Sequence, residues 1–287
     1  METYEPRILS LIAEILWFCI LSELVFAQLP EPPKLNYDMI ADFFQLYVFH
    51  RGKHPLMEFD SSGKFLRSIA DDLFVTAHMV RVDPEDNIWT ADIGSHVVLK
   101  LSPEGRVLLA LGRMRIPGDD VGHFNQPTDV AWDRDGNVYV TDGYGNSRVL
   151  KFDKYGNKLL GWGMKGSGPG QFDTPHTIAI DGDLVYVGDR ENARIEIFDT
   201  NGRFLRQWNL GHPFGLVITP DHFVYMCDAI AARILKIDPQ GKVVGSFNGP
   251  RPGQGPHFDP HEIALAPDGS IFTAEVVGWR AEKLQPK

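Results

Sequence analysis

The feature that most constrains the fold of this chain of 287 residues is a repeated turn centred on glycine. The turn recurs in segments such as FDKYGNKL (152–159) and FDTNGRFL (198–205), and runs rich in Val, Ile, Tyr and Phe precede it. Further turns such as DRDGN (133–137) separate these runs. Because Asp-Gly and Asn-Gly pairs favour tight hairpin turns, each unit is expected to contain four short strands. The turn glycines, which are separated by 42, 51, 46 and 39 residues, are Gly63, Gly105, Gly156, Gly202 and Gly241.

A period near 40–45 residues with four strands per unit is typical of a β-propeller. One four-stranded sheet cannot bury both of its faces alone, whereas sheets packed around an axis bury them against their neighbours. We therefore predict an all-β fold, a six-bladed β-propeller over residues 40–287; a β-sandwich would not explain a repeat of this length. The last unit has no clear fourth strand, so a strand from residues 34–45 is expected to complete it and close the ring. The expected units are about 40–72, 73–112, 113–165, 166–209, 210–248 and 249–287.

The composition limits the partners and the kinds of site. The chain has 28 Lys and Arg against 38 Asp and Glu, which gives a formal net charge of −10. No segment is basic enough to follow a phosphate backbone, so nucleic acid is not an expected partner. The two cysteines, Cys19 and Cys227, exclude a disulfide framework and a Cys-rich zinc module. A metal site would therefore have to use histidines and carboxylates.

Residues 8–27 form the only long apolar stretch, and its end, VFA, fits the small residues that precede a signal-peptidase site. We predict that residues 1–27 are a signal peptide, that residues 28–39 are a Pro-rich extended spacer, and that the protein is exported to the periplasm or the extracellular space. Two glutamates interrupt the stretch, which is unusual for a spanning helix. An uncleaved anchor and an ordinary amphipathic helix are the alternatives, and only the anchor would bring the chain to a membrane.

One position at the start of the first strand holds a histidine in alternate units. In chain order this position holds His78, Thr128, His176, Phe214 and His261. Equivalent positions of a propeller form a ring around its axis, so three imidazoles from alternate blades are expected to converge on one point. A single histidine there would more often cap a strand or bond a turn, but the threefold alternation favours a metal site. Three neutral nitrogens suit Zn²⁺ with an open position for water or substrate, and Fe²⁺, Co²⁺ and Cu²⁺ are alternatives.

A second position, after the second strand, holds Arg51, Tyr144 and Arg190 in three of the units. The loops that carry it lie on the same face of a propeller as the loops that enter the first strands, so these side chains are expected to surround the mouth of the channel. Two arginines there indicate an anionic substrate, most simply a carboxylate held by N–H donors. A phenol beside a cation and a metal ionises more readily, which suits Tyr144 as a base. The alternative for each arginine is a surface salt bridge, such as Arg190 with Glu191.

Other repeated charges are expected to be structural. Arginines just before the third strands are expected to make bridges between blades, and aspartates at the ends of the second strands to accept hydrogen bonds. The arginines are Arg148, Arg194 and Arg233, and the aspartates are Asp92, Asp142, Asp189 and Asp228.

The repeat resembles the NHL repeat, and the chain more closely resembles the peptidyl-α-hydroxyglycine α-amidating lyases, which also form the lyase part of the peptide-amidating monooxygenase. The resemblance covers roughly residues 45–275. Two of its segments, DGYGNSR and DRENARI, are specific enough to separate this family from generic NHL scaffolds. The segments that carry it are FHRGKH (49–54), FNQPTDVA (124–131), DGYGNSR (142–148), PGQFDTPHTIA (169–179), DRENARI (189–195) and HFDPHEI (257–263).

This resemblance implies a six-bladed propeller with a zinc ion on three histidines, a catalytic tyrosine and two active-site arginines. By their positions in the motifs these residues are His78, His176, His261, Tyr144, Arg51 and Arg190. It also implies a structural calcium in the channel, with the Glu262 carboxylate and the Val80 backbone carbonyl as ligands. The family usually has Asp where this chain has Glu262.

The activity that the resemblance implies is that of a zinc-dependent carbon–nitrogen lyase. The enzyme would cleave an N-acyl- or peptidyl-α-hydroxyglycine into a terminal amide and glyoxylate, so its expected partner is a small anionic substrate of this class or a peptide. One alternative is a non-catalytic NHL sensor or scaffold that binds a protein or a ligand at the channel mouth. Another is a metal-dependent propeller enzyme such as a lactonase, against which the histidine column argues.

Overall fold

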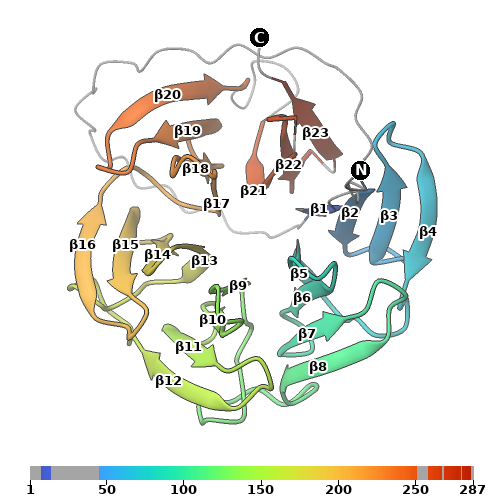
Figure 1. The fold of residues 1–287 in the computed structure, drawn as a ribbon, viewed down its shortest axis with the longest axis horizontal. Coiled ribbons are helices and arrows are strands. Elements are labelled where there is room, and N and C mark those ends of the chain that lie inside the picture. Colours follow the sequence, from blue (N-terminus) through green and yellow to red (C-terminus); the bar gives the residue numbers. More distant parts are fainter. Residues whose placement is uncertain (1–7, 14–44, 251–257, 267, 279, 286–287) are drawn as a thin grey trace, which may run out of the picture.

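The computed structural model of this chain is a ring of six β-sheets around a central axis, which Figure 1 shows from above. It describes residues 8–13, 45–250, 258–266, 268–278 and 280–285, and these residues form strands, turns and loops without a helix. The all-β, six-bladed propeller is therefore confirmed. The strands are β1 (Ile8–Ala13), β2 (Gln45–His50), β3 (Leu56–Asp60), β4 (Phe65–Ile69), β5 (Ala77–Val82), β6 (Ile88–Asp92), β7 (Val97–Leu101), β8 (Val107–Gly112), β9 (Asp129–Trp132), β10 (Val138–Asp142), β11 (Arg148–Phe152), β12 (Lys158–Trp162), β13 (Pro175–Asp181), β14 (Leu184–Asp189), β15 (Arg194–Asp199), β16 (Phe204–Trp208), β17 (Gly215–Ile218), β18 (Val224–Asp228), β19 (Arg233–Ile237), β20 (Val243–Asn248), β21 (Pro260–Leu265), β22 (Ile271–Glu275) and β23 (Arg280–Leu284).

The blades follow the chain around the ring, and each runs from the axis outwards. The second to fifth blades each contain four antiparallel strands in chain order, namely β5–β8, β9–β12, β13–β16 and β17–β20. The sixth sheet contains β21, β22 and β23 among the described residues. A fourth strand was expected there from residues 34–45; of these only Gln45, the first residue of β2, is described. That expected strand therefore lies outside the described residues.

The first blade takes its inner strand from the N-terminal apolar stretch. β1 pairs in parallel with β2, whereas β2, β3 and β4 pair in antiparallel fashion, and β1 lies at the axis near β5 and β21 (Figure 1). A short apolar run fits an inner strand as well as it fits a signal core, which is why the sequence did not distinguish them. Cleavage after Ala27 would remove β1 from this blade. Residues 14–27 and the spacer 28–39 lie outside the described residues, so cleavage stays a prediction; within the part that is described, no helix is long and apolar enough to cross a bilayer.

The repeated glycine turn also determines how closely neighbouring blades approach each other. The five turn glycines have φ between 76° and 88°, a region that residues with a Cβ rarely adopt. A Cβ on Gly202 would lie 2.8 Å from the Trp162 ring, and a Cβ on Gly241 would lie 2.3 Å from the Trp208 ring. Both tryptophans end the outer strand of the preceding blade. Glycine therefore provides both the turn and the space for the neighbouring blade.

The repeated arginines and aspartates fix the connections between blades, as expected. Arg194 donates to the Asp189 carboxylate at 2.9 Å and to the backbone carbonyls of Ser167, Gly168 and Gln171 in the connection that enters the fourth blade. Equivalent pairs in the neighbouring blades are Arg148–Asp142 and Arg233–Asp228. These pairs hold the loops on the face where the inner strands begin, which is the face that carries the candidate site.

Candidate metal centre

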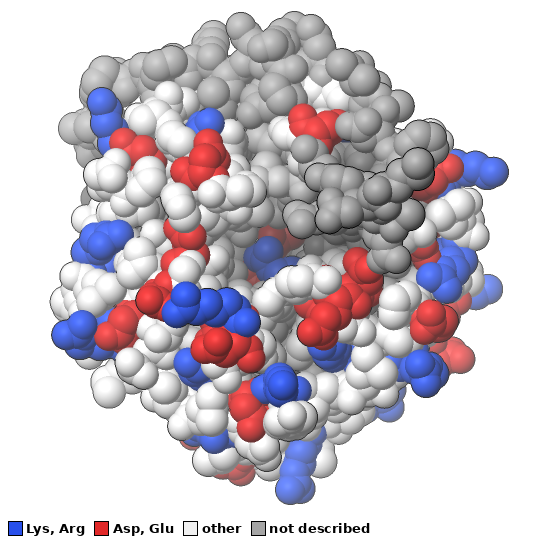
Figure 2. All heavy atoms as spheres, viewed as in Figure 1, with Lys and Arg blue, Asp and Glu red and all other residues white. Residues whose placement is uncertain are grey.

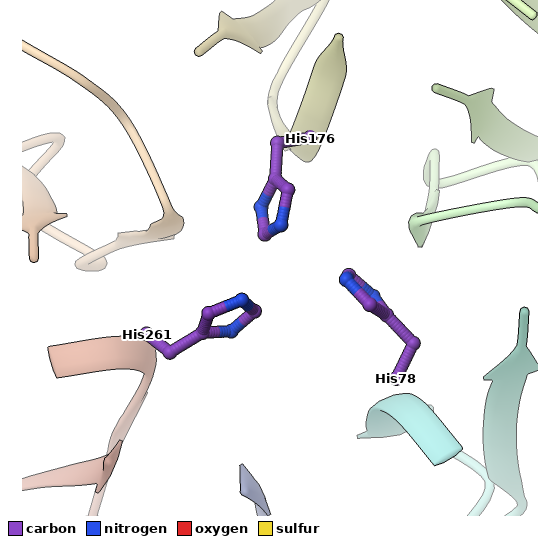
Figure 3. A group of neighbouring side chains, drawn as sticks. All are labelled: His78, His176 and His261. Atoms are coloured by element: carbon purple, nitrogen blue, oxygen red, sulfur yellow. The ribbon is translucent and has the colours of Figure 1, made fainter. Parts of the chain in front are cut away.

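Three histidines from alternate blades meet at the axis of the ring. His78, His176 and His261 lie near the starts of β5, β13 and β21, and Figure 3 shows their rings pointing toward one another. Their ring centroids are 4.8–5.5 Å apart, and one nitrogen of each ring lies within 4.8 Å of the others. All three side chains are buried. The structure thus brings together the three histidines of the sequence column in an arrangement that could hold one metal ion.

Each of these histidines is the extra residue of a β-bulge. Ala77 pairs with Asp92 and Met79 pairs with Ala91, so no residue of β6 lies opposite His78. The same shift in register skips His176 in β13 and His261 in β21. A bulge changes the direction of a side chain relative to the regular alternation of a strand and is frequent beside active sites. In three alternate blades, a bulge therefore interrupts the regular strand at the histidine, next to the axis of the ring.

Backbone carbonyls fix the tautomer of two of the three rings. His78 Nδ1 lies 2.7 Å from the Thr128 carbonyl oxygen, and His176 Nδ1 lies 2.7 Å from the Phe214 carbonyl oxygen. Because a carbonyl only accepts, each Nδ1 carries the hydrogen and each Nε2 presents a lone pair. Thr128 and Phe214 are the members of the same sequence column that are not histidine. The intervening third and fifth blades thus orient two of the imidazoles, as the outer hydrogen bonds of metal sites commonly do.

The three imidazoles are held in their neutral form. Burial lowers the pKa of His78 to about 3, and the charges of Arg51 and Arg190 act in the same direction. Burial also places the pKa of His176 and of His261 well below the usual range, with the neighbouring imidazoles and Arg190 contributing to both. Neutral imidazole is the form that binds a metal ion, so protons do not compete for these nitrogens near neutral pH.

The Tyr144 hydroxyl lies directly against this group. Its oxygen is 3.1 Å from His78 Nε2 and 3.0 Å from His176 Nε2. A phenol has one hydrogen, so the Tyr144 hydroxyl can donate to only one of these two nitrogens at a time. A cation among the three rings would satisfy both nitrogens and the oxygen together. Two oriented Nε2 lone pairs, a third imidazole and a phenol oxygen therefore fit a metal ion, and such a donor set suits Zn²⁺.

Two glycines allow the loop that carries Tyr144 to pack closely against its neighbours. A Cβ on Gly143 would lie 2.1 Å from the Pro175 carbonyl oxygen, and a Cβ on Gly145 would lie 2.1 Å from the Asn125 side chain. The backbone of Gly145 also donates to the Asn125 carbonyl at 2.9 Å. No larger residue fits either position without displacing a neighbour, which explains the glycines on both sides of the tyrosine.

Arg190 lies beside Tyr144 and also makes the expected surface pair. Its Nη1 donates to the Tyr144 oxygen at 3.2 Å, and its Nε donates to Glu191 at 2.8 Å. Its guanidinium lies 5.3 Å from the Tyr144 ring centre and 5.0 Å from that of Phe214. Burial alone would lower the pKa of Arg190, but Tyr144 and Glu191 raise it. The salt bridge and the contact with Tyr144 are therefore present together, and a fixed positive charge adjoins the phenol.

Arg51 approaches the same group from the first blade. Its Nε donates to the Ala77 carbonyl at 3.3 Å, next to His78, and its charge helps to lower the pKa of His78 and His261. A pocket of about 540 Å³ opens beside Tyr144, between the loop of residues 143–148 and the connection that leads to the fourth blade. The structure therefore places both arginines and the tyrosine of the second sequence column near the histidines, and of these residues Tyr144 lines the pocket.

The two residues implied to hold calcium lie in the next layer along the axis. Val80 is in β5 two residues after His78, and Glu262 directly follows His261 in β21. The Glu262 carboxylate is buried, and its Oε1 lies 3.5 Å from Nη2 of Arg81. A guanidinium, which the sequence did not indicate, is therefore the closest charged partner of this carboxylate.

Comparison with known proteins matches the NHL repeat to residues 124–152 and 172–198. The chain is 31% identical over 278 residues to "Peptidylglycine alpha-amidating monooxygenase" of Rattus norvegicus, an alignment that covers 80% of this chain and 28% of that protein. It is 33% identical over 285 residues to "Peptidyl-glycine alpha-amidating monooxygenase A" of Xenopus laevis, with 84% and 30% covered. It is 31% identical over 227 residues to a "Probable peptidyl-alpha-hydroxyglycine alpha-amidating lyase" of Caenorhabditis elegans, with 71% and 62% covered. The chain thus spans less than two thirds of the length of each of these relatives.

Solved structures support the fold. The chain superimposes on "Streptogramin B lyase structure" with a TM-score of 0.60 at 16% identity, covering 91% of this chain and 85% of that one. It superimposes on the virginiamycin B lyase of Staphylococcus aureus with a TM-score of 0.57 at 15% identity, covering 88% and 83%. At these identities the likeness concerns the arrangement of the blades alone.

Proposed function

Because this chain belongs to the peptidyl-α-hydroxyglycine α-amidating lyase family of NHL-repeat propellers, we propose that it cleaves N-acyl- or peptidyl-α-hydroxyglycines into a terminal amide and glyoxylate. The observation that carries the proposal is the position of the Tyr144 oxygen, which lies within 3.2 Å of two imidazole nitrogens and of one guanidinium nitrogen. A base, a cation and a candidate metal site thus meet at one point. Such an arrangement suits the removal of a proton from an α-hydroxyl group.

The two arginines are proposed to bind the carboxylate of the substrate. Arg51 and Arg190 both lie near the histidine group and act electrostatically on His78 and His261. A guanidinium can hold a carboxylate through two parallel N–H donors, which fixes its orientation as well as its position. The α-carbon would then lie close to the Tyr144 oxygen. Holding the reacting groups in this way can supply a large part of the rate enhancement.

The bond changes follow from these positions. Tyr144, as its phenolate, takes the proton of the α-hydroxyl group, and the electron pair left on that oxygen forms the aldehyde C=O bond. The bond between the α-carbon and the amide nitrogen breaks, its electron pair goes to nitrogen, and Tyr144 returns the proton to that nitrogen, which regenerates the phenolate. The products are the terminal amide and glyoxylate. Arg190 stabilises the phenolate before this step, because its Nη1 already donates to that oxygen.

His78, His176 and His261 are proposed to hold Zn²⁺. When bound, zinc would act as a Lewis acid that stabilises negative charge on the substrate oxygens. The neutral, oriented imidazoles support zinc, since they present lone pairs and need to lose no proton.

The direct test is turnover of N-benzoyl-α-hydroxyglycine, with benzamide and glyoxylate measured together. Zinc-loaded protein is expected to release the two in equal amounts; removal of the metal by a chelator should abolish the release, and added zinc should restore it. Protein that holds zinc but does not accelerate cleavage above the spontaneous rate would contradict the proposal and favour the NHL scaffold.

Export from the cytoplasm is part of the proposal and rests on the apolar stretch of residues 8–27. The mass of the protein recovered from its producing cells tests it. A chain that begins after Ala27 would support a cleaved signal, and a chain that retains residues 8–13 would keep β1 in the first blade.

A further inference from the structure

A second charged layer lies next to the three histidines along the axis. Arg81 of β5 donates from Nε and Nη2 to the two carboxylate oxygens of Asp129, the first residue of β9, at 2.7 Å and 2.6 Å. The Arg81 side chain is 16% exposed and that of Asp129 is 1% exposed. This bidentate pair joins the second and third blades at the hub, and no step of the proposed reaction uses it.

Asp129 is satisfied on both of its oxygens. Besides Arg81, its Oδ1 accepts from the Val130 amide at 2.7 Å, and its Oδ2 accepts from the Thr177 hydroxyl and the Ile178 amide, both at 2.9 Å. The Thr177 oxygen in turn accepts from the Leu216 amide at 3.1 Å. One carboxylate therefore connects the guanidinium to the fourth blade and, through Thr177, to the fifth.

Glu262 brings the sixth blade to the same guanidinium. Its Oε1 lies 3.5 Å from Arg81 Nη2 and accepts from the Ile263 amide at 3.2 Å. Nη2 also donates to the Leu216 carbonyl at 3.4 Å. A Cβ on Gly215 would lie 3.2 Å from the same Oε1, so glycine leaves the space that this carboxylate occupies. Arg81 thus faces oxygens from the third, fifth and sixth blades.

A calcium ion does not fit this layer as it is built. Ca²⁺ takes six to eight oxygen ligands at about 2.3–2.6 Å. An ion bound to Glu262 would lie within a few ångströms of a guanidinium, which repels it strongly in a site with little water. Asp129, the other carboxylate that faces Arg81, already uses both oxygens. The residues that the family resemblance assigns to calcium, Glu262 and Val80, therefore adjoin a cation that belongs to the chain.

We infer that the Arg81 guanidinium is the fixed cation of this hub, in the place where the family resemblance implies calcium, and that the fold of this chain requires no calcium. The guanidinium neutralises the carboxylates of the third and sixth blades and holds both beside the strands that carry the histidines. It does so without depending on the calcium concentration around the protein.

The test uses the full chain and needs no turnover, so it is independent of the proposed lyase activity. Protein prepared in millimolar Ca²⁺ and then desalted is expected to contain no stoichiometric calcium, and its Tm should not change when Ca²⁺ is added. Arg81→Met should lower the Tm by roughly 10 °C, because it leaves buried carboxylates without their cation. The matched control is Arg134→Met, which removes an exposed pair with Asp183 and should leave the Tm unchanged.

Glu262→Gln is the second variant, because it keeps the Arg81–Asp129 pair intact. It is expected to fold, with a Tm close to that of the wild type and with no response to Ca²⁺. One calcium ion per wild-type chain, a rise in the Tm with Ca²⁺ that Glu262→Gln abolishes, or a normal Tm in Arg81→Met would each overturn the inference.

Discussion

Arg190 donates a hydrogen bond to the Tyr144 oxygen at 3.2 Å, while its guanidinium lies 5.3 Å from the centre of the same tyrosine ring. The cation therefore acts on the oxygen that is proposed to remove the substrate proton. The same guanidinium is fixed by Glu191 on its other side, so it is in place before a substrate arrives. Preorganisation of this kind means that little rearrangement is needed when negative charge develops.

Replacing Tyr144 by Phe should remove the proton acceptor and keep the ring. Because general bases typically contribute 10²–10⁴-fold, we expect glyoxylate release to fall by roughly that factor, while bound zinc stays at the wild-type level. Tyr155→Phe is the control, since Tyr155 is 72% exposed and lies on an outer turn. Wild-type turnover in Tyr144→Phe would remove the tyrosine from the mechanism.

Replacing Arg190 by Lys should keep the positive charge but remove the parallel N–H donors of the guanidinium. We expect KM for the substrate to rise and the acid limb of the kcat profile to move to higher pH, because the phenolate loses the hydrogen bond that stabilises it. A loss of structure alone would lower kcat equally at all pH values. Arg134→Lys, at an exposed pair, provides the comparison. An unchanged pH profile would contradict the role given to Arg190.

Acid should destabilise the metal-free protein through the buried histidines. The folded protein holds His176 at a pKa well below 6.5, so between that pKa and pH 6.5 only the unfolded chain binds the proton. Stability that is present above pH 6.5 is therefore lost as the pH falls. Compared with His176→Gln, the wild type should lose about 1.4 kcal/mol of unfolding free energy for each pH unit below 6.5. Urea unfolding at a series of pH values measures this, and parallel curves for the two proteins would refute it.

Gly145→Ala should displace the Tyr144 loop, because the added Cβ would lie 2.1 Å from the Asn125 side chain. We expect a loss of roughly 1–3 kcal/mol in unfolding free energy and a lower kcat. Gly122→Ala is the control, since the nearest atom to its Cβ would be 3.7 Å away. If Gly145→Ala retained both stability and turnover, the close packing of this loop would not matter for the site.

Five of the six blades could be predicted from the turn glycine, which lies between the third and fourth strands of each, and the sixth from the unit 249–287 that follows them. The inner strand of the first blade could not be predicted in the same way. β1 contains no turn and no member of the repeat, and it pairs in parallel, which requires no short hairpin next to it in the sequence. From the sequence alone, its apolar residues therefore fit the core of a signal peptide equally well.

The candidate site could be located from the histidine and arginine columns of the sequence, because equivalent positions lie at the same depth in every blade. The bulges and the carbonyls of Thr128 and Phe214 depend on backbone geometry that residue types do not show. The second layer did leave a signal in the sequence. Asp129 and Glu262 occupy the same position of their repeats, directly after the histidine column, although only the structure shows that Arg81 lies between them.

Charged side chains are mixed on the surface, whereas the groups of the candidate site lie together at the axis. On the face shown in Figure 2, basic and acidic side chains are interspersed over the described residues, without a continuous basic stripe. The three imidazoles, two arginines and the phenol instead lie together at the axis. The chemistry of the molecule is therefore concentrated where the inner strands begin.

The metal content of the purified chain tests the central claim most directly. Elemental analysis is expected to find one zinc ion per chain in the wild type and in His222→Ala, which changes an exposed histidine, and at least about tenfold less in His176→Ala. The absence of any stoichiometric transition metal from the wild type, or full occupancy in His176→Ala, would contradict a metal centre built from three alternate blades.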